Sequence, residues 1–112
     1  MKSSNIIKRF DAVEAFQSRL RYFKKKELRK FAEQTILSIS GILSEIFVKR
    51  KQLSHDMNVR LKREIQSCKR EYYSMFSPGM SWSFFKNAVC FLLGIRVYSI
   101  AINYYTKINN RK

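Results

Sequence analysis

The chain has 112 residues, enough for one domain, and its 23 Lys and Arg against 8 Asp and Glu give a formal net charge of +15. Nine Phe, six Tyr and one Trp are too many aromatic residues for a disordered chain, and three Gly with one Pro are too few for a turn-rich all-β architecture. Two Cys cannot build a disulfide scaffold, and a single His excludes most catalytic constellations.

The first three-quarters of the chain is typical of helix, because no proline occurs before Pro78 and apolar residues recur at steps of three and four. No stretch alternates apolar and polar residues, so we expect an all-α fold. Residues 5–76 are predicted to form two or three basic amphipathic helices, arranged as a small hairpin or bundle. The last carries a narrow stripe of about three heptads, short for an autonomous coiled coil but enough for a partner helix. The stripe consists of Leu53, Met57, Leu61, Ile65, Cys68, Tyr72 and Met75.

The breaks between these helices are less marked than the helices themselves. Ser54-His55-Asp56 gives the strongest turn prediction, because Ser and Asp favour caps over helix interiors. Residues 38–41, which end in a glycine, give the second. The lysine run at residues 24–26 contains no breaker, so it lies either inside one long helix or at a bend.

A Ser-Pro-Gly sequence marks the firm boundary that follows, because proline cannot extend a preceding helix and glycine permits positive φ. We expect a hinge over residues 77–81. Residues 82–112 are then predicted to form a hydrophobic helix, capped by Ser81 or Ser83 and reaching about Tyr105, with a short basic tail.

The segment from Ala88 to Ile102 is mainly apolar and contains one charge, Arg96. A bilayer span needs about 20 predominantly apolar residues, and extension to that length adds Lys86 and two asparagines. Trp82 and a pair of tyrosines flank the segment as interfacial aromatic residues do. However, an arginine at mid-bilayer costs about 2.5–3.5 kcal/mol, so a span is borderline.

Two interpretations of this helix therefore stay open. Either it associates with a membrane, by spanning it or by lying in the interface, or it is the buried central helix of a small bundle. Hydropathy alone does not separate the two. In both, membrane or packing contacts are expected from Trp82, Phe85, Leu92, Leu93, Ile95, Arg96, Ile100 and Tyr104.

Two basic clusters carry most of the unbalanced charge. On one continuous helix, residues 19–31 would place four basic side chains on one arc, and the second cluster begins at residues 49–51. Such arcs can neutralise the phosphates of DNA or RNA, or bind an anionic leaflet. The predicted polyanion-binding residues are Arg21, Lys25, Lys26, Arg29, Lys49, Arg50, Lys51, Arg60, Lys62 and Arg63.

The residues that carry catalytic chemistry are scarce. His55 is the only histidine and has no partner at a recognisable spacing. Cys68 and Cys90 suit two reduced thiols in a reducing compartment, although Lys69 and Arg70 could lower the pKa of the Cys68 thiol. No Gly-rich phosphate loop and no metal-ligand spacing occurs. We expect no catalytic, cofactor-binding or metal-binding residue, no small-molecule substrate and no enzymatic activity.

These features together favour a small non-enzymatic helical protein that associates with a membrane through its C-terminal hydrophobic helix. It would act as an interaction or assembly factor, with an anionic membrane surface and a protein or a second copy as partners. The first ten residues lack the apolar run of a signal peptide, so an intracellular, membrane-associated location is expected. The alternative is a soluble basic helical nucleic-acid-binding protein of the cytoplasm or nucleus.

Overall fold

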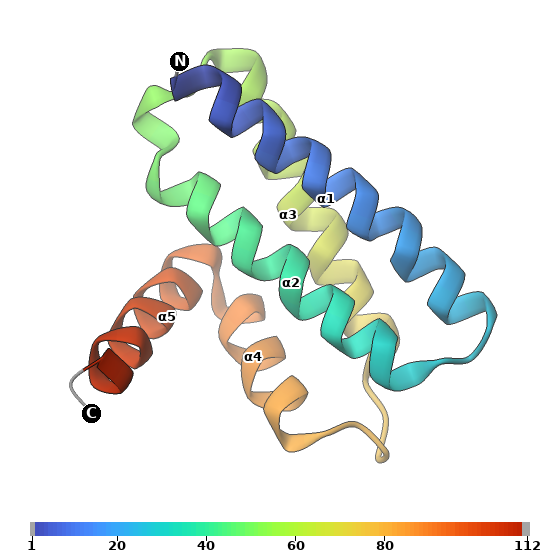
Figure 1. Cartoon of the computed structure of the whole chain (residues 1–112). Helices are drawn as coiled ribbons and strands as arrows, with labels where there is room; N and C mark the ends of the chain where they lie inside the picture. The colour runs from blue at the N-terminus through green and yellow to red at the C-terminus, as the bar shows by residue number, and fades with distance from the viewer. Residues whose placement is uncertain (1, 111–112) are drawn as a thin grey trace.

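One 20-residue helix, α2 (Arg29–Val48), lies at the centre of the fold and contacts every other α-helix (Figure 1). The computed structural model describes residues 2–110, with side chains from Ile6 to Tyr104. Over these residues the chain is all-α, as the sequence predicts, and has no strand. The other elements are α1 (Lys2–Lys25), the short 3₁₀ helix η1 (Arg50–Gln52), α3 (His55–Met75), α4 (Trp82–Leu93) and α5 (Ile95–Asn110).

Helices α1 and α3 lie beside each other, and both pack on α2 (Figure 1). Side-chain hydrogen bonds join them: for example, Gln17 Nε2 donates to a Glu64 carboxylate oxygen at 3.0 Å, and Lys24 Nζ donates to Glu71 at 2.9 Å. The amphipathic helices predicted over residues 5–76 are thus three in number and form one bundle.

The apolar stripes predicted from the spacing supply the core of this bundle. On α3, the five stripe residues from Leu61 to Met75 are buried, while Leu53 and Met57 are half-buried. Stripes at the same helical spacing on α1 and α2 meet them, so each helix buries one face and leaves the other wet. The buried members from α1 and α2 are Ile6, Phe10, Val13, Leu20, Ala32, Ile36, Ile39, Leu43 and Ile46.

The lysine run at residues 24–26 ends α1 in a bend. Glu27 adopts φ 58°, the Leu28 amide donates to the Phe23 carbonyl at 2.9 Å, and the Glu27 amide donates to the Lys24 carbonyl at 3.2 Å. This pair of bonds is the Schellman motif, which satisfies carbonyls that the ending helix leaves unpaired. A continuous helix through residues 19–31 is therefore wrong.

Replacing Glu27 by glycine is expected to raise the free energy of unfolding by about 0.5–1 kcal/mol. A left-handed conformation costs an L-residue about 1–2 kcal/mol, and part of that gain is lost because glycine makes the unfolded chain more flexible. Urea unfolding of the two proteins measures the change. Glu27→Gln is the control, since it removes the charge and keeps the Cβ. An equal gain in both variants would assign the effect to charge.

Serine side chains begin α3 and α4. The Ser54 hydroxyl accepts from the Met57 amide at 3.3 Å, which confirms the predicted break at Ser54, while His55 and Asp56 are already the first residues of α3. The Ser81 hydroxyl accepts from the Phe84 amide at 3.2 Å, so Ser81 rather than Ser83 is the cap. The second predicted turn, at residues 38–41, is wrong: this stretch lies inside α2, where the packing of the flanking apolar residues outweighs the low helix propensity of glycine.

The single hydrophobic helix predicted from residue 82 is also wrong, because the chain breaks at Gly94. Gly94 has φ 142° and ψ 149°, a conformation that is essentially restricted to glycine. Helices α4 and α5 have 12 and 16 residues, and at about 1.5 Å per residue neither reaches the 30 Å of a bilayer core. The predicted basic tail is helical to Asn110, and residues 111–112 lie outside the described residues.

The helix that is long and apolar enough to cross a membrane is α2. This 20-residue helix contains an 18-residue window with a mean hydropathy of 1.3, and half of the window is buried inside the bundle. A core helix of a soluble protein passes the same test, and α2 occupies that central place. The alternative in which the C-terminal helix is the buried central helix of the bundle is therefore wrong, because α2 occupies that place.

Candidate functional site

The outer faces of α4 and α5 carry large apolar side chains that the fold leaves exposed. On α4 they recur at steps of three and four from Trp82, which is 69% exposed, to Leu93, which is 70% exposed. On α5, Ile100 is 63% exposed and Tyr104 is 68% exposed. We call these the apolar outer face, and its members are Trp82, Phe85, Val89, Leu93, Val97, Ile100 and Tyr104.

The opposite faces of α4 and α5 fix them to the bundle. Phe84, Ala88 and Phe91 are fully buried, and the Phe84 and Phe91 rings each lie 5.3 Å from the Tyr72 ring of α3, centroid to centroid. On α5, the Ser99 hydroxyl lies within hydrogen-bond distance, 3.0 Å, of Ser44 on α2. The packing of this inner face therefore fixes the orientation of α4 and α5 and keeps the side chains of the opposite face exposed to solvent.

Aromatic rings continue the apolar outer face across the loop between α3 and α4. Tyr73 lies edge-on to Phe76, Phe76 lies beside Phe85, and Phe85 stacks on Trp82 with centroids 5.6 Å apart. Tyr73 is 63% exposed. Contiguous exposed apolar surface of this kind marks a binding surface more often than a solvated one.

The structure divides the eight residues that the sequence predicted for membrane or packing contacts. Two of them, Leu92 and Ile95, are half-buried against the core. The others are exposed: Trp82, Phe85, Leu93, Arg96, Ile100 and Tyr104. Val89 and Val97 also lie on this face and were not among the predicted residues. Counting steps of three and four from Trp82 would have found Val89, because it lies four residues after Phe85.

The predicted basic arc of residues 19–31 does not form, because α1 ends within it. Lys25 and Lys26 lie at the tip of the bend, whereas Arg29 turns inward. The Arg29 guanidinium donates to a Glu33 carboxylate oxygen at 3.3 Å and to the backbone carbonyl of Met75. Arg29 therefore holds the bundle together, and Arg21 lies apart from the tip, beside a cleft between α1 and α3.

The second basic cluster lies at the other end of α2 and along α3. Lys49, Arg50 and Lys51 follow the C-terminus of α2, where positive charge is favourable, and the Arg50 guanidinium lies 4.3 Å from the Phe47 ring centroid. Arg60 pairs with Glu14 and lies over the Phe10 ring. The remaining predicted residues, Lys62 and Arg63, are exposed on α3. The ten predicted residues therefore do not share one face.

Internal ion pairs use up four of the eight acids. They are Arg9–Glu45, Lys24–Glu71, Arg29–Glu33 and Arg60–Glu14. Three of these pairs are partly exposed and contribute little to stability, whereas the Glu33 carboxylate of the Arg29–Glu33 pair is buried. Their effect on the surface is larger than on the fold, because they leave the remaining basic side chains with few acids nearby.

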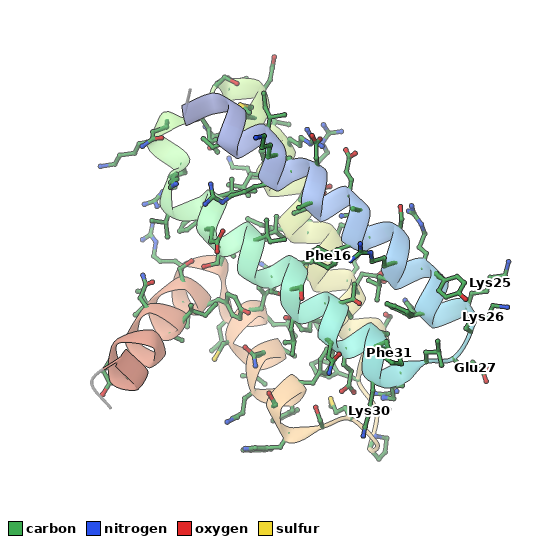
Figure 2. The ribbon with its side chains drawn as sticks, in the orientation of Figure 1. Phe16, Lys25, Lys26, Glu27, Lys30 and Phe31 are labelled. Carbon is green, nitrogen blue, oxygen red and sulfur yellow. The ribbon has the colours of Figure 1, made fainter. Side chains whose placement is uncertain are left out.

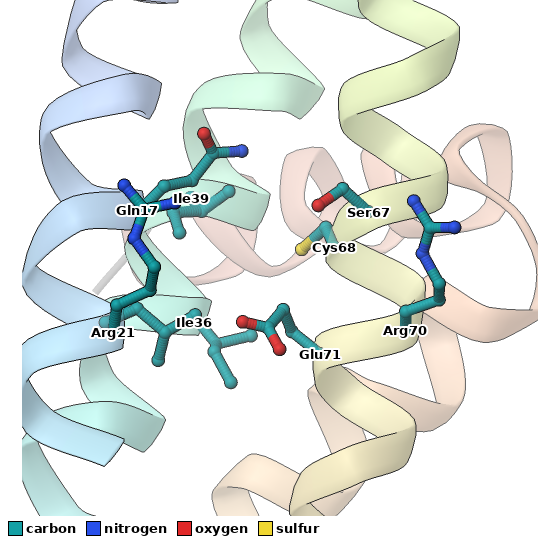
Figure 3. Close-up of a pocket in the computed structure, with 9 residues that line it drawn as sticks. Gln17, Arg21, Ile36, Ile39, Ser67, Cys68, Arg70 and Glu71 are labelled. Carbon is teal, nitrogen blue, oxygen red and sulfur yellow. The ribbon is translucent and has the colours of Figure 1, made fainter. Parts of the chain in front are cut away.

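A cleft of about 380 Å³ lies between α1 and α3 (Figure 3). Apolar side chains from α2, Ile36 and Ile39, form its floor, and Glu71 points into it from α3. Cys68 also lines the cleft, and burial raises the pKa of its thiol to about 12. The expectation that Lys69 and Arg70 could lower this pKa is therefore wrong, and the thiol is neutral near pH 7.

A buried hydrogen-bond network lies behind this cleft. The Ser40 hydroxyl on α2 contacts the Tyr72 hydroxyl and the Cys68 thiol of α3, and it donates to the Ile36 carbonyl at 3.0 Å. Burial raises the pKa of Tyr72 well above its usual range and raises the pKa of Tyr98 to about 12. Ser40 thus gives the buried Tyr72 hydroxyl and Cys68 thiol a hydrogen-bond partner in the core.

Comparisons of this chain with protein-family models, with curated proteins and with solved structures found no match. In the part of the chain that the structure describes, no three His, Cys, Asp or Glu side chains come together as a metal site would require. The apolar outer face and the basic side chains around it are the surface features that indicate a function.

Proposed function

We propose that this protein binds the surface of an anionic membrane through the apolar outer face of α4 and α5, without spanning the bilayer. The observation that carries the proposal is the exposure of Trp82, Leu93, Ile100 and Tyr104, each 63–70% exposed, on helices whose other face is packed. This is the pattern of an interfacial helix, which buries one apolar face at the boundary between headgroups and acyl chains.

The charge around this face supports a membrane rather than water as its surroundings. No acid follows Glu71 in the sequence, so neither α4 nor α5 carries a negative charge. Lys86 and Arg96 are the basic side chains described on these helices, and both are exposed. They can reach phosphate groups while their stems lie on the apolar surface. Arg96 then stays at the level of the headgroups, so the free-energy cost of an arginine at mid-bilayer does not arise.

The magnitudes support reversible association. Full burial of a Leu or Ile side chain contributes about 1.5–3 kcal/mol, and each Lys or Arg near an anionic leaflet about 1 kcal/mol. If several side chains of α4 and α5 are partly buried in the membrane, these contributions add up to reversible binding in the micromolar range rather than permanent attachment. On this membrane surface the protein acts as a non-enzymatic interaction or assembly factor.

Trp82 provides the test, because it is the only tryptophan in the chain and lies within the proposed contact. Titration with vesicles of phosphatidylcholine and phosphatidylserine should shift its fluorescence to the blue and protect it from a water-soluble quencher. An emission spectrum that stays that of a wet indole at saturating vesicles would contradict the proposal.

A matched pair of variants locates the contact. Leu93→Ser with Ile100→Ser should weaken vesicle binding by about 10- to 100-fold, because two apolar side chains leave the contact. Val48→Ser with Val59→Ser removes two exposed apolar side chains elsewhere, which are 56% and 41% exposed, and should bind like the parent chain. Equal weakening in both variants would remove α4 and α5 as the binding surface.

The alternative function, nucleic-acid binding by a soluble protein, is favoured by the exposed bases of α3. Lys62, Arg63 and Arg70 lie on its outward side, away from the buried stripe. A complex with duplex or single-stranded nucleic acid that weakens steeply with salt would support it. Replacement of these three bases should then weaken the complex, whereas Leu93→Ser should leave it unchanged.

A further inference from the structure

The bend between α1 and α2 carries exposed apolar and basic side chains on both sides of one acid, Glu27. Tyr22 is 56% exposed, Phe31 is 53% exposed and Leu28 is 39% exposed. Figure 2 shows Lys25, Lys26 and Glu27 at the bend itself, with Lys30 and Phe31 at the start of α2. We call the set of Tyr22, Lys25, Lys26, Leu28, Lys30 and Phe31 the basic tip.

The three lysines of the basic tip carry charge that the fold does not use. None of them has a carboxylate within ion-pair distance among the described side chains, whereas their neighbours Lys24 and Arg29 are paired with Glu71 and Glu33. Lys24 and Arg29 are therefore neutralised within the bundle, whereas the lysines of the basic tip are exposed without an acidic partner.

The apolar side chains of the basic tip are ordered by contacts with neighbouring residues. The Phe31 ring stacks on the Phe23 ring with centroids 5.4 Å apart, and Tyr22 lies edge-on to Phe23. Leu28 follows the residue with positive φ, and its amide donates to the Phe23 carbonyl. Because these side chains are already ordered, binding of the basic tip to a lipid surface does not cost the entropy of ordering a flexible loop.

The basic tip lies at the same end of the bundle as the start of the apolar outer face. The Ser81 hydroxyl, next to Trp82, donates to a Glu33 carboxylate oxygen at 3.1 Å. Glu33 lies in the first turns of α2, two residues after Phe31. Its other carboxylate oxygen accepts a hydrogen bond from Arg29. The first turns of α2, which follow the bend, are thus linked to the N-cap of α4 through one glutamate.

We propose that the basic tip binds anionic headgroups of the same membrane that receives the apolar outer face, and that its lysines make the association selective for negatively charged lipid. This inference rests on the proposed function. Stable attachment of a protein without a spanning helix generally needs two signals, an apolar contact and a cluster of positive charge. The apolar outer face supplies the first, and Lys25, Lys26 and Lys30 supply the second.

The test compares two variants of the full chain that lose equal charge. Lys25→Gln, Lys26→Gln and Lys30→Gln neutralise the basic tip, and Lys49→Gln, Lys51→Gln and Lys62→Gln neutralise exposed bases toward the opposite end of α2. Each lysine near an anionic leaflet contributes about fivefold in affinity, so the tip variant should bind phosphatidylserine-containing vesicles about 100-fold more weakly. The control variant should lose less than about fivefold, because its charges lie toward the other end of α2, a 20-residue helix about 30 Å long, and the Debye length is about 10 Å. Trp82 fluorescence reports both.

The outcomes separate this inference from the proposed function. On vesicles of phosphatidylcholine alone, the tip variant and the parent chain should bind equally. If both triple variants lose the same affinity for anionic vesicles, net charge alone attracts the protein and the inference is wrong, while the proposed function stands. A parent chain that binds neither kind of vesicle removes both. If the tip variant binds vesicles normally but loses a complex with nucleic acid, the basic tip belongs to that partner and the inference fails.

Discussion

Replacing Phe91 by alanine is expected to lower the free energy of unfolding by about 3–5 kcal/mol, the largest loss of any single change considered for this chain. The Phe91 side chain is fully buried, and its ring centroid lies 5.3 Å from those of both Tyr72 and Tyr98. Removal of the ring leaves a cavity where α3, α4 and α5 meet, and the surrounding rigid rings cannot collapse to fill it. Urea unfolding at neutral pH measures the loss.

Leu93→Ala is the matched control, because Leu93 lies two residues further along α4 and is 70% exposed. It should change the free energy of unfolding by less than about 0.5 kcal/mol, as surface substitutions usually do. If Phe91→Ala costs less than 1 kcal/mol, α4 and α5 are not packed on the bundle as described. The proposed function predicts the opposite order for vesicle binding, in which Leu93 matters directly.

The helices could be predicted from the sequence because periodicity is a local property. Apolar residues at steps of three and four from Leu61 to Met75 identify a face, and a face of that width must be buried against something. Ser54 and the Ser-Pro-Gly sequence could be read in the same way, since capping hydroxyls and proline act on the backbone within a few residues.

Two breaks could not be predicted, for different reasons. The bend after Lys25 depends on Glu27 in a left-handed conformation, which is unfavourable for an L-residue. The packing of Phe23 on Phe31 offsets this cost. Gly94 was visible as a glycine, but a glycine inside an apolar run is equally compatible with close helix packing. The break is decided by the contacts of Phe91 and Tyr98 on either side of it.

The candidate site was predictable in its composition but not in its orientation. The apolar residues of α4 include buried Phe84 and exposed Phe85, which are neighbours with the same chemistry. What separates them is Tyr72, whose ring packs against Phe84. Likewise, Arg21, Lys25 and Arg29 have similar charge, yet only the fold shows that Arg29 is used internally. Which face meets a partner follows from tertiary packing, which spacing alone does not contain.

A rise in pH from 9 to 12 is expected to remove about 3–4 kcal/mol of stability through Cys68 alone. Burial, with smaller contributions from Glu71 and Glu64, raises the pKa of this thiol from 9.0 to about 12 in the folded chain. Between these values the unfolded chain loses the thiol proton and the folded chain keeps it. The contribution of the neutral thiol is therefore complete below pH 9 and is lost as pH rises to 12, at about 1.4 kcal/mol per pH unit. Urea unfolding across this range measures the slope.

Cys68→Ser isolates this contribution, because a hydroxyl does not titrate in the same range. The variant should be less stable than the parent near neutral pH, since the sulfur packs in an apolar site, but its stability should fall less steeply between pH 9 and 12. A residual slope is expected from Tyr98, whose pKa burial raises to about 12, and from Tyr72. If the two proteins lose stability in parallel, the thiol is not buried where α1, α2 and α3 meet. The hydrogen-bond network through Ser40 would then need a different arrangement of α3 against α2.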